Sequence, residues 1–237
     1  MPEQPASGSV VVIGGTSGLG RDLAERYAAR GQQVIVTGRD RERAAKIAAE
    51  IGGDTRGIAV DLTRLEEIRD ALAEVGPVGH LVLSAFFRDR NFARDFQLSS
   101  GRDAVTIKLL GYIEVVHALH DRLAETGSVL VYGGGLKDRP QPGTITVSTS
   151  NAAVTGLIRA LAVELKPVRV NAIHPGMVAD SPFWSAQPTE IKESIRGRTP
   201  TGRYITMREV TDAAVMLLEN PAINGTNLDV NGGAFLM

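Results

Sequence analysis

The sequence predicts an α/β protein built on one doubly wound parallel sheet. Short apolar runs rich in branched residues alternate with segments of helical spacing along the whole chain. Such runs are typical of buried parallel strands, and the segments between them carry charged outer faces, as surface helices do. This alternation implies a parallel sheet with helices on both faces. The expected strands are Val10–Ile13, Gln33–Thr37, Ile58–Val60, Leu81–Ser84, Val129–Tyr132 and Val168–Ile173.

Length and composition favour one domain that spans residues 1–237. The chain is 43% hydrophobic and 22% charged, which suffices for a single sizeable core. The expected helices include Arg21–Arg30, Arg41–Ile51 and Ala104–Leu123. One long irregular stretch, Met177–Thr206, contains three prolines and Trp184. We expect this segment (177–206) to form a lid or substrate loop, the alternative being an ordinary surface excursion.

Charge and residue usage exclude several classes of function. A net charge of −1 without any run of Lys or Arg argues against nucleic acid or an anionic membrane as a partner. No apolar run approaches the roughly 20 residues of a membrane span. The chain has no cysteine and four scattered histidines, so we expect neither disulfides nor a metal site. The segment Met1–Gly8 lacks the basic and apolar regions of a signal peptide, and we expect a cytoplasmic protein.

A glycine-rich turn directly follows the first expected strand and opens the first helix. Glycines permit a tight turn and a close backbone approach to a ligand, and the N–H groups of the helix N-terminus attract a pyrophosphate. Strand, turn and helix occur in the order that a dinucleotide site requires. The expected pyrophosphate-binding residues are Gly14, Thr16, Ser17, Gly18, Leu19 and Gly20.

The end of the second strand indicates which dinucleotide binds. An NAD-selective site places a carboxylate there to hold the ribose 2′-hydroxyl, whereas this chain has the neutral Thr37. Arg39, two residues later, can pair with a 2′-phosphate through its planar donor fork. We therefore expect NADP(H) rather than NAD(H). The alternative is a solvated turn arginine beside Asp40.

The segment Val147–Leu165 resembles the active-site helix of the short-chain dehydrogenase/reductase family. That helix carries Tyr-x-x-x-Lys, then small residues and Ala-Val-Glu-Leu, and the chain keeps this frame without a gap. The glycine spacing and the closing segments Thr199–Arg203 and Asn224–Gly233 are also similar to this family, so the resemblance covers nearly the whole chain. It implies a Rossmann-type fold, a nicotinamide cofactor, a small-molecule substrate and a homodimer or homotetramer.

The resemblance implies where the rest of the cofactor lies. Asp61 and Leu62 occupy the positions of the family's adenine contact, although Asp61 suits a helix N-cap equally well. Further contacts are expected at the fourth strand and at the loop after the sixth strand. These residues are Ser84, Ala85, Pro175, Gly176 and Val178.

Three residues near these contacts depart from the family pattern. Phe86 replaces a glycine beside the cofactor ribose, so its ring either narrows the nicotinamide end or turns into the core. Asp180 replaces a threonine and would place a negative charge near the diphosphate. His174 stands where a small polar residue is commoner, and we interpret it as structural.

All four catalytic positions implied by the resemblance are changed. Gly134 stands in place of the serine that bonds the carbonyl oxygen, and Val147 in place of the tyrosine that protonates the alkoxide. Asn151 replaces the lysine that lowers the pKa of that tyrosine, and Lys108 replaces the asparagine of the proton relay. Loss of one proton donor costs about 10²–10⁴ in rate. We therefore do not expect carbonyl reduction by the family's own mechanism.

A rebuilt catalytic pair is the hypothesis that the residues allow. Lys108 would project an ammonium into the cleft, and Tyr132 lies two residues before Gly134, so strand alternation would put both on one face. The alternatives are a core tyrosine and a solvated helix lysine. Other polar candidates near the cleft are Ser148, Thr144 and Asp180.

Three functions remain open at this point. The favoured one is an NADP(H)-binding oxidoreductase with a divergent catalytic site. The others are a non-redox enzyme on the same scaffold (a cyclase, isomerase or dehydratase) and a non-catalytic dinucleotide-binding or partner protein. The sequence does not identify the substrate, although several aromatic residues suggest an apolar or aromatic one. These are Phe86, Phe87, Phe92, Phe183 and Trp184.

Overall fold

Seven parallel strands form one sheet in the order β3-β2-β1-β4-β5-β6-β7 in the computed structural model, which describes residues 7–236. The chain proceeds outward from β1 to β3, returns to place β4 on the other side of β1, and continues outward to β7. The predicted doubly wound parallel α/β class is thereby confirmed. The strands are β1 (Ser9–Ile13), β2 (Val34–Gly38), β3 (Thr55–Ala59), β4 (Val78–Leu83), β5 (Leu123–Tyr132), β6 (Arg169–Pro175) and β7 (Asn227–Val230).

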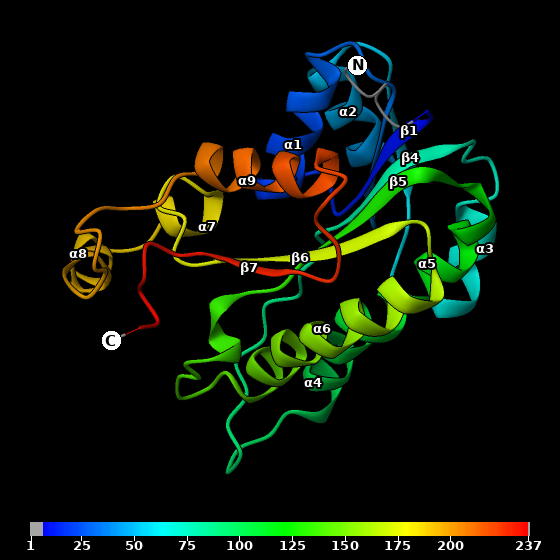
Figure 1. Cartoon of the computed structure of the whole chain (residues 1–237). Helices are drawn as coiled ribbons and strands as arrows, with labels where there is room; N and C mark the ends of the chain where they lie inside the picture. Colours follow the sequence, from blue (N-terminus) through cyan, green and yellow to red (C-terminus); the bar gives the residue numbers. More distant parts are fainter. Residues whose placement is uncertain (1–6, 237) are drawn as a thin grey trace.

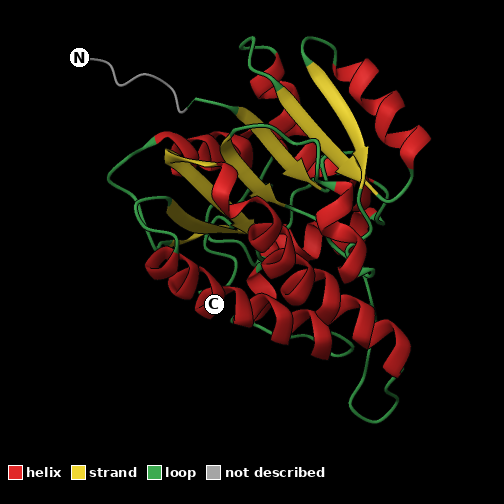
Figure 2. Cartoon of the chain, turned by 90° about the vertical axis from the view of Figure 1, so that its right-hand side faces the viewer, coloured by secondary structure: helices red, strands yellow, loops and turns green. Residues whose placement is uncertain are grey.

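Helices cover both faces of the sheet (Figures 1 and 2). Alternate residues of β1 enter two separate apolar cores: Val10 and Val12 pack on one side, Val11 and Ile13 on the other. This division follows from the two-residue period of a strand. The first face carries α1 (Gly18–Ala28), α2 (Arg41–Ile51) and α9 (Met207–Glu219); the second carries α3 (Ile68–Ala71), α4 (Leu98–Val105), α5 (Gly111–Leu119) and α6 (Ile145–Glu164).

The helix expected at Ala104–Leu123 has different ends. It begins at Leu98 with α4, passes through a π-helical segment η2 (Thr106–Leu110) into α5, and closes with a 3₁₀ turn at His120–Arg122. Leu123 already belongs to β5. At this end of the helix the Arg122 guanidinium donates to the carbonyls of Leu72 and Val75, at 2.7 and 2.8 Å. The spacing of apolar residues along a helix does not reveal such a contact between distant parts of the chain.

The expectation of irregular structure across 177–206 is wrong. Two short helices form there, α7 (Pro182–Ser185) and α8 (Thr189–Gly197). Pro182 stands in the first turn of α7 and Pro188 is the N-cap of α8, positions that tolerate proline because no intrahelical N–H bond is needed there. The ends of the segment are joined by a parallel bridge between Val178 and Ile205.

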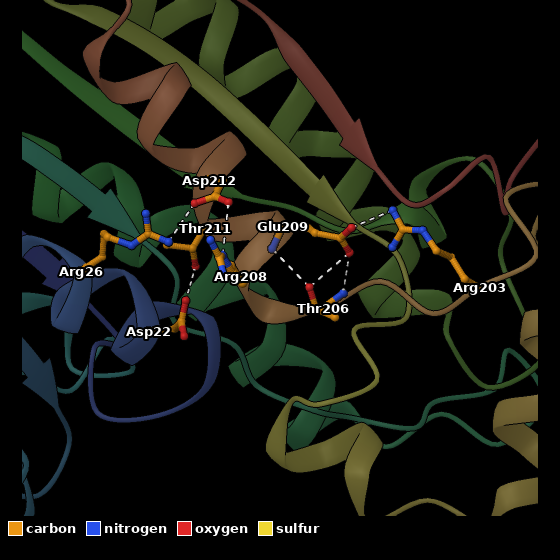
Figure 3. Close-up of polar contacts among 8 residues, drawn as sticks. All are labelled: Asp22, Arg26, Arg203, Thr206, Arg208, Glu209, Thr211 and Asp212. Atoms are coloured by element: carbon orange, nitrogen blue, oxygen red, sulfur yellow. Dashed lines mark hydrogen bonds and ion pairs between the residues drawn. The ribbon is translucent and has the colours of Figure 1, made fainter.

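The N-terminus of α9 fixes the far end of this segment (Figure 3). Thr206 and Glu209 form a reciprocal capping box, which satisfies backbone donors of the first turn. The Arg203 guanidinium lies 2.7 Å from the Glu209 carboxylate, and it lowers the pKa of Glu209 to about 2. On the next turn, Thr211 donates to Asp22 of α1. These contacts hold α9 against α1 and against the segment that precedes it.

Two expectations concern membranes and targeting. Within residues 7–236, none of the helices combines the length and the apolar character needed to cross a bilayer. The expectation that the chain has no signal peptide rests on Met1–Gly8, and residues 1–6 of this segment lie outside the described residues.

A buried histidine predicts acid sensitivity of the fold. His80 is 4% exposed, and its Nδ1 lies 2.9 Å from Ser128 Oγ, which itself donates to the Leu218 carbonyl. The hydroxyl must therefore accept from an Nδ1–H. Burial lowers the pKa of His80 to about 4. Because the unfolded chain binds this proton from about pH 6.5 downward, the free energy of unfolding should fall by about 2 kcal/mol between pH 7 and pH 5.

Urea unfolding at the two pH values measures this loss. His80→Asn should reduce the difference between them, whereas His120→Gln, at an exposed histidine, should leave it unchanged. An equal pH dependence in wild type and His80→Asn would contradict the assignment.

Candidate functional site

The glycine turn packs directly on the end of β4. Gly14 has φ +84°, and a Cβ at this position would come within 2.6 Å of the Ala85 backbone nitrogen. A Cβ on Gly20 would overlap the hydroxyl of Ser84. Both glycines are therefore required by close backbone approach. The packing brings the predicted cofactor residues of the turn together with Ser84 and Ala85.

The same turn is open at its centre. Gly18 has φ +54°, and an added Cβ would meet no atom within 4 Å. It begins α1, whose N-cap Ser17 uses no side-chain capping bond. Thr16 lies against the end of β2, where a Cβ on Gly38 would come within 2.9 Å of it. Free N–H groups at a helix N-terminus beside open space can hold a phosphate.

Arg39 leaves β2 with its side chain unengaged. Thr37, within the strand, accepts a hydrogen bond from Gly14 N at 3.2 Å. Asp40 caps α2 by accepting from Arg43 N at 2.7 Å. Among residues 7–236, no ion pair or hydrogen bond involves the exposed guanidinium of Arg39. The geometry gives Asp40 a capping role rather than that of a partner for Arg39.

Asp61 and Leu62 follow β3 and are held by local contacts. One carboxylate oxygen of Asp61 accepts from the backbone N and the hydroxyl of Thr63, at 3.0 and 2.7 Å. These bonds form a local turn and do not make Asp61 the helix N-cap considered from the sequence, because the next helical turn, η1 (Leu65–Glu67), has Arg64 as its N-cap. The other carboxylate oxygen makes no such bond among the described residues. The Leu62 side chain is buried against Gly111. It can therefore offer a ligand its backbone only.

The loop after β6 carries the remaining residues predicted to contact the cofactor. Gly176 donates to the Val230 carbonyl at 3.0 Å, and a Cβ on it would come within 2.8 Å of Asn231. Val178 is buried. The Asp180 carboxylate accepts from Met207 N at 2.8 Å, at the start of α9. Its charge is thus compensated by that helix N-terminus, which the sequence did not predict.

His174 holds the turn after β5. Its Nδ1 accepts from Gly134 N at 3.2 Å, so its Nε2 donates to Asn227 Oδ1 at 2.9 Å. The ring is fully buried, and burial lowers the pKa of His174. A Cβ on Gly133 would overlap this ring. His174 therefore has a structural place between β5 and β7.

A narrow hollow of about 10 Å³, roughly the space of one water molecule, lies at the positions where the family's catalytic residues would stand. Lys108, on η2, is 4% exposed and donates from Nζ to the Tyr132 carbonyl at 2.6 Å. Burial lowers the pKa of Lys108 to about 8. Among the described residues no carboxylate forms an ion pair with it. The hollow is lined by Phe86, Phe87, Ala104, Lys108, Val147, Ser150 and Asn151.

Tyr132 meets Lys108 through its backbone only. Its ring packs in the core on the opposite face of the sheet, with α1 and α9, and its buried hydroxyl has no hydrogen-bond partner among residues 7–236. Burial raises the pKa of Tyr132. A Cβ on Gly134 would point at Asn151 Nδ2, 2.8 Å away, on the α6 side. The expected shared face is wrong because β5 ends at Tyr132 and strand alternation stops there.

Two polar side chains in the hollow lack partners. Asn151 Oδ1 and Ser150 Oγ are buried, and neither has a hydrogen bond within the part of the chain that the structure describes. Unpaired buried polar atoms are costly and call for a ligand or water. Ser150 was missed in the sequence, although it stands three residues after Val147 on one helix face. The candidates Thr144 and Ser148 are bonded to each other at 2.8 Å.

Comparisons with known proteins agree with this geometry. Residues 14–234 match a protein-family model described as enoyl-(acyl carrier protein) reductase. The 3-oxoacyl-[acyl-carrier-protein] reductase FabG of Aquifex aeolicus is 30% identical, with 95% of this chain and 96% of the relative covered. Carbonyl reductase family member 4 of Danio rerio is also 30% identical, with 96% and 98% covered. A structure described as an NAD(P)-dependent gluconate 5-dehydrogenase of Beutenbergia cavernae, with NADP bound at low occupancy, has 28% identity and a TM-score of 0.88 over 100% of both chains.

The contact between Gly134 and Asn151 predicts that the two positions are coupled. Gly134→Ser should lower the free energy of unfolding by about 1–2 kcal/mol, because the new Cβ would press on the Asn151 amide. Gly134→Ser combined with Asn151→Ala should recover most of the loss. Urea unfolding measures both effects.

Gly156→Ser is the matched control, since a side chain there would meet no atom within 4 Å. A Gly134→Ser variant as stable as wild type, or one that Asn151→Ala does not relieve, would show that these positions are independent.

Proposed function

The chain belongs to the short-chain dehydrogenase/reductase family, and on that premise we propose that it is an NADP(H)-dependent oxidoreductase whose proton donor is Lys108. Members of this family are oxidoreductases that use a nicotinamide dinucleotide and act on small molecules. The observation that carries the proposal is the buried ammonium of Lys108 beside the unpaired groups of Ser150 and Asn151. The tyrosine position, Val147, has no proton to give.

The residues at the cofactor end fit NADP(H). The backbone N–H groups at Ser17 and Gly18, beside open space, would bind the pyrophosphate. The Arg39 guanidinium, which has no partner among the described residues, would bind the 2′-phosphate. The free oxygen of Asp61 and the backbone of Leu62 would hold the adenine. A neighbour of known structure, described as NAD(P)-dependent, holds NADP at low occupancy. The other holding residues would be Gly14, Thr16, Leu19, Gly20, Ser84, Ala85, Pro175, Gly176 and Val178.

The hollow would bind the substrate's carbonyl group. When bound, NADPH supplies a hydride for the carbonyl carbon. Lys108 then gives one proton from Nζ to the oxygen, which completes the two-electron reduction, and solvent restores the proton to the amine. The Tyr132 carbonyl orients the ammonium, so Tyr132 acts as a positioning residue through its backbone. The Ser150 hydroxyl can donate a further hydrogen bond to the same oxygen, whereas the unpaired Asn151 Oδ1 can only accept one from the substrate or from water.

Segment 177–206 would serve as the lid over this site. Its ends are joined at Val178 and Ile205, so the segment can move as one unit on a narrow base. Phe183 of α7 already contacts Arg88 on the loop after β4. A closed lid would exclude water from the hollow and strengthen the electrostatic effect of Lys108.

Arg39 should decide cofactor preference. In calorimetric titrations, Arg39→Gln should weaken NADPH binding about 10–100-fold and leave NADH binding unchanged, because only the contact to the 2′-phosphate is lost. Arg41→Gln, at an exposed arginine two residues later, should change neither. Equal affinity of the wild type for NADPH and NADH would contradict the role of Arg39.

Lys108 should control turnover. Over a panel of aromatic aldehydes and ketones, Lys108→Met should lower kcat for NADPH oxidation by about 10²–10⁴ without changing NADPH affinity. Wild-type kcat should fall as pH rises through about 8, the pKa of Lys108, since the protonated amine is the active form.

Lys46→Met, at an exposed lysine on α2, should match the wild type. Undiminished turnover in Lys108→Met would place the proton donor elsewhere. Tight NADPH binding without turnover of any carbonyl would favour the non-redox or binding functions.

A further inference from the structure

A second cation, Arg88, lies near Phe86, one of the residues that line the hollow. Arg88 lies on the loop after β4, and its Cζ is 3.1 Å from the ring centroid of Phe183 and 5.5 Å from that of Phe86. Phe183 belongs to α7 of segment 177–206, whereas Phe86 lines the hollow. The guanidinium therefore joins the loop after β4 to the segment that would close over the site.

The positive charge of Arg88 lacks a counter-ion among the described residues. In residues 7–236, no carboxylate pairs with the Arg88 guanidinium. The adjacent acidic residue is committed elsewhere, because the Asp89 carboxylate accepts from the Thr146 hydroxyl and the Asn91 amide. Lys108 Nζ lies 5.5 Å from the same Phe86 ring that Arg88 approaches. Arg88 and Lys108, neither of which pairs with a carboxylate within residues 7–236, thus both lie near the Phe86 ring.

Stacking leaves the hydrogen-bonding edge of Arg88 available. A guanidinium over an aromatic face uses its flat surface, while its N–H groups point outward in the plane. That fork suits bidentate binding of a carboxylate or a phosphate. The ring contacts also restrict the side chain, so less conformational entropy is lost when an anion binds.

We infer that Arg88 recognises an anionic group, a carboxylate or phosphate, on a substrate whose apolar body lies over Phe86 and Val147. This inference rests on the proposed function in taking the hollow as the substrate site. The anion would sit at Arg88, and the reacting carbonyl would reach Lys108, which approaches the same Phe86 ring. Arg88 is then a specificity-determining residue, since a neutral analogue leaves its guanidinium without a partner.

The chain provides its own reporter for this test. Its single tryptophan, Trp184, packs edge-on against Phe183, with ring centroids 5.1 Å apart. Fluorescence excited at the indole can follow titration of the full chain, with and without NADP⁺. The probes are 4-phenylbutyrate, phenethyl phosphate and the neutral 4-phenylbutyramide. We expect at least one anion to bind about tenfold or more tightly than the amide.

Arg88→Gln should remove this difference between anion and amide. Arg90→Gln is the matched control, because Arg90 lies on the same loop and faces the Phe92 ring at 5.4 Å. The Arg90→Gln variant should still bind the anion more tightly than the amide. Urea unfolding checks that both variants are folded. The relative affinity of the two anions tells carboxylate from phosphate.

Three results would overturn the inference: no binding of either anion, equal binding of the amide, or an equal loss in Arg90→Gln. None of these readouts needs hydride transfer. Failure to bind NADPH with intact anion binding would instead reject the proposed function and leave the Arg88 site in place.

Discussion

The hydrogen bond from Lys108 to the last carbonyl of β5 is the constraint on which the site depends. It places a buried cation, without a carboxylate partner among the described residues, at the end of the central part of the sheet. A buried charge of this kind costs several kcal/mol, which one hydrogen bond and two neighbouring rings offset only in part. The π-helical turn that carries Lys108 is itself a less favourable geometry, and such turns often occur at functional sites. Both features agree with the proton-donor role that we propose for Lys108.

The two ends of the site differ in how much of the family pattern they keep. At the cofactor end, the turn around Gly18 remains open, and Arg39 has no partner among residues 7–236. At the chemical end, the replaced residues fit one another: Gly134 leaves room for Asn151, whose amide fills the space of a serine side chain. The catalytic residues therefore cannot be restored one at a time. On the proposed function, the chemistry has moved from α6 to η2, across the same hollow.

The features that the sequence predicted correctly are those that depend on residues close together in the chain. The sheet, the bounds of α2 and the glycine turn follow from short patterns of residues that interact with their neighbours in the chain. The side of the sheet that Tyr132 faces could not be predicted from such patterns, because it depends on where β5 ends and how the following glycines turn. The partner of Asp180 belongs to α9, 27 residues later. The burial of Lys108 depends on a π-helical turn that helical spacing does not reveal.

The ionisation state of Lys108 decides whether this side chain can donate a proton in the hollow. The chain has five lysines, so NMR of protein labelled with ¹³C at lysine Cε can follow each side chain through a pH titration. We predict one lysine with a pKa of about 8, well below the ordinary value of 10.5, whose signal disappears in Lys108→Met. A Lys108 signal that titrates at or above 10.5 would contradict this prediction, because Lys108 would then be a solvated side chain and no proton donor of the hollow.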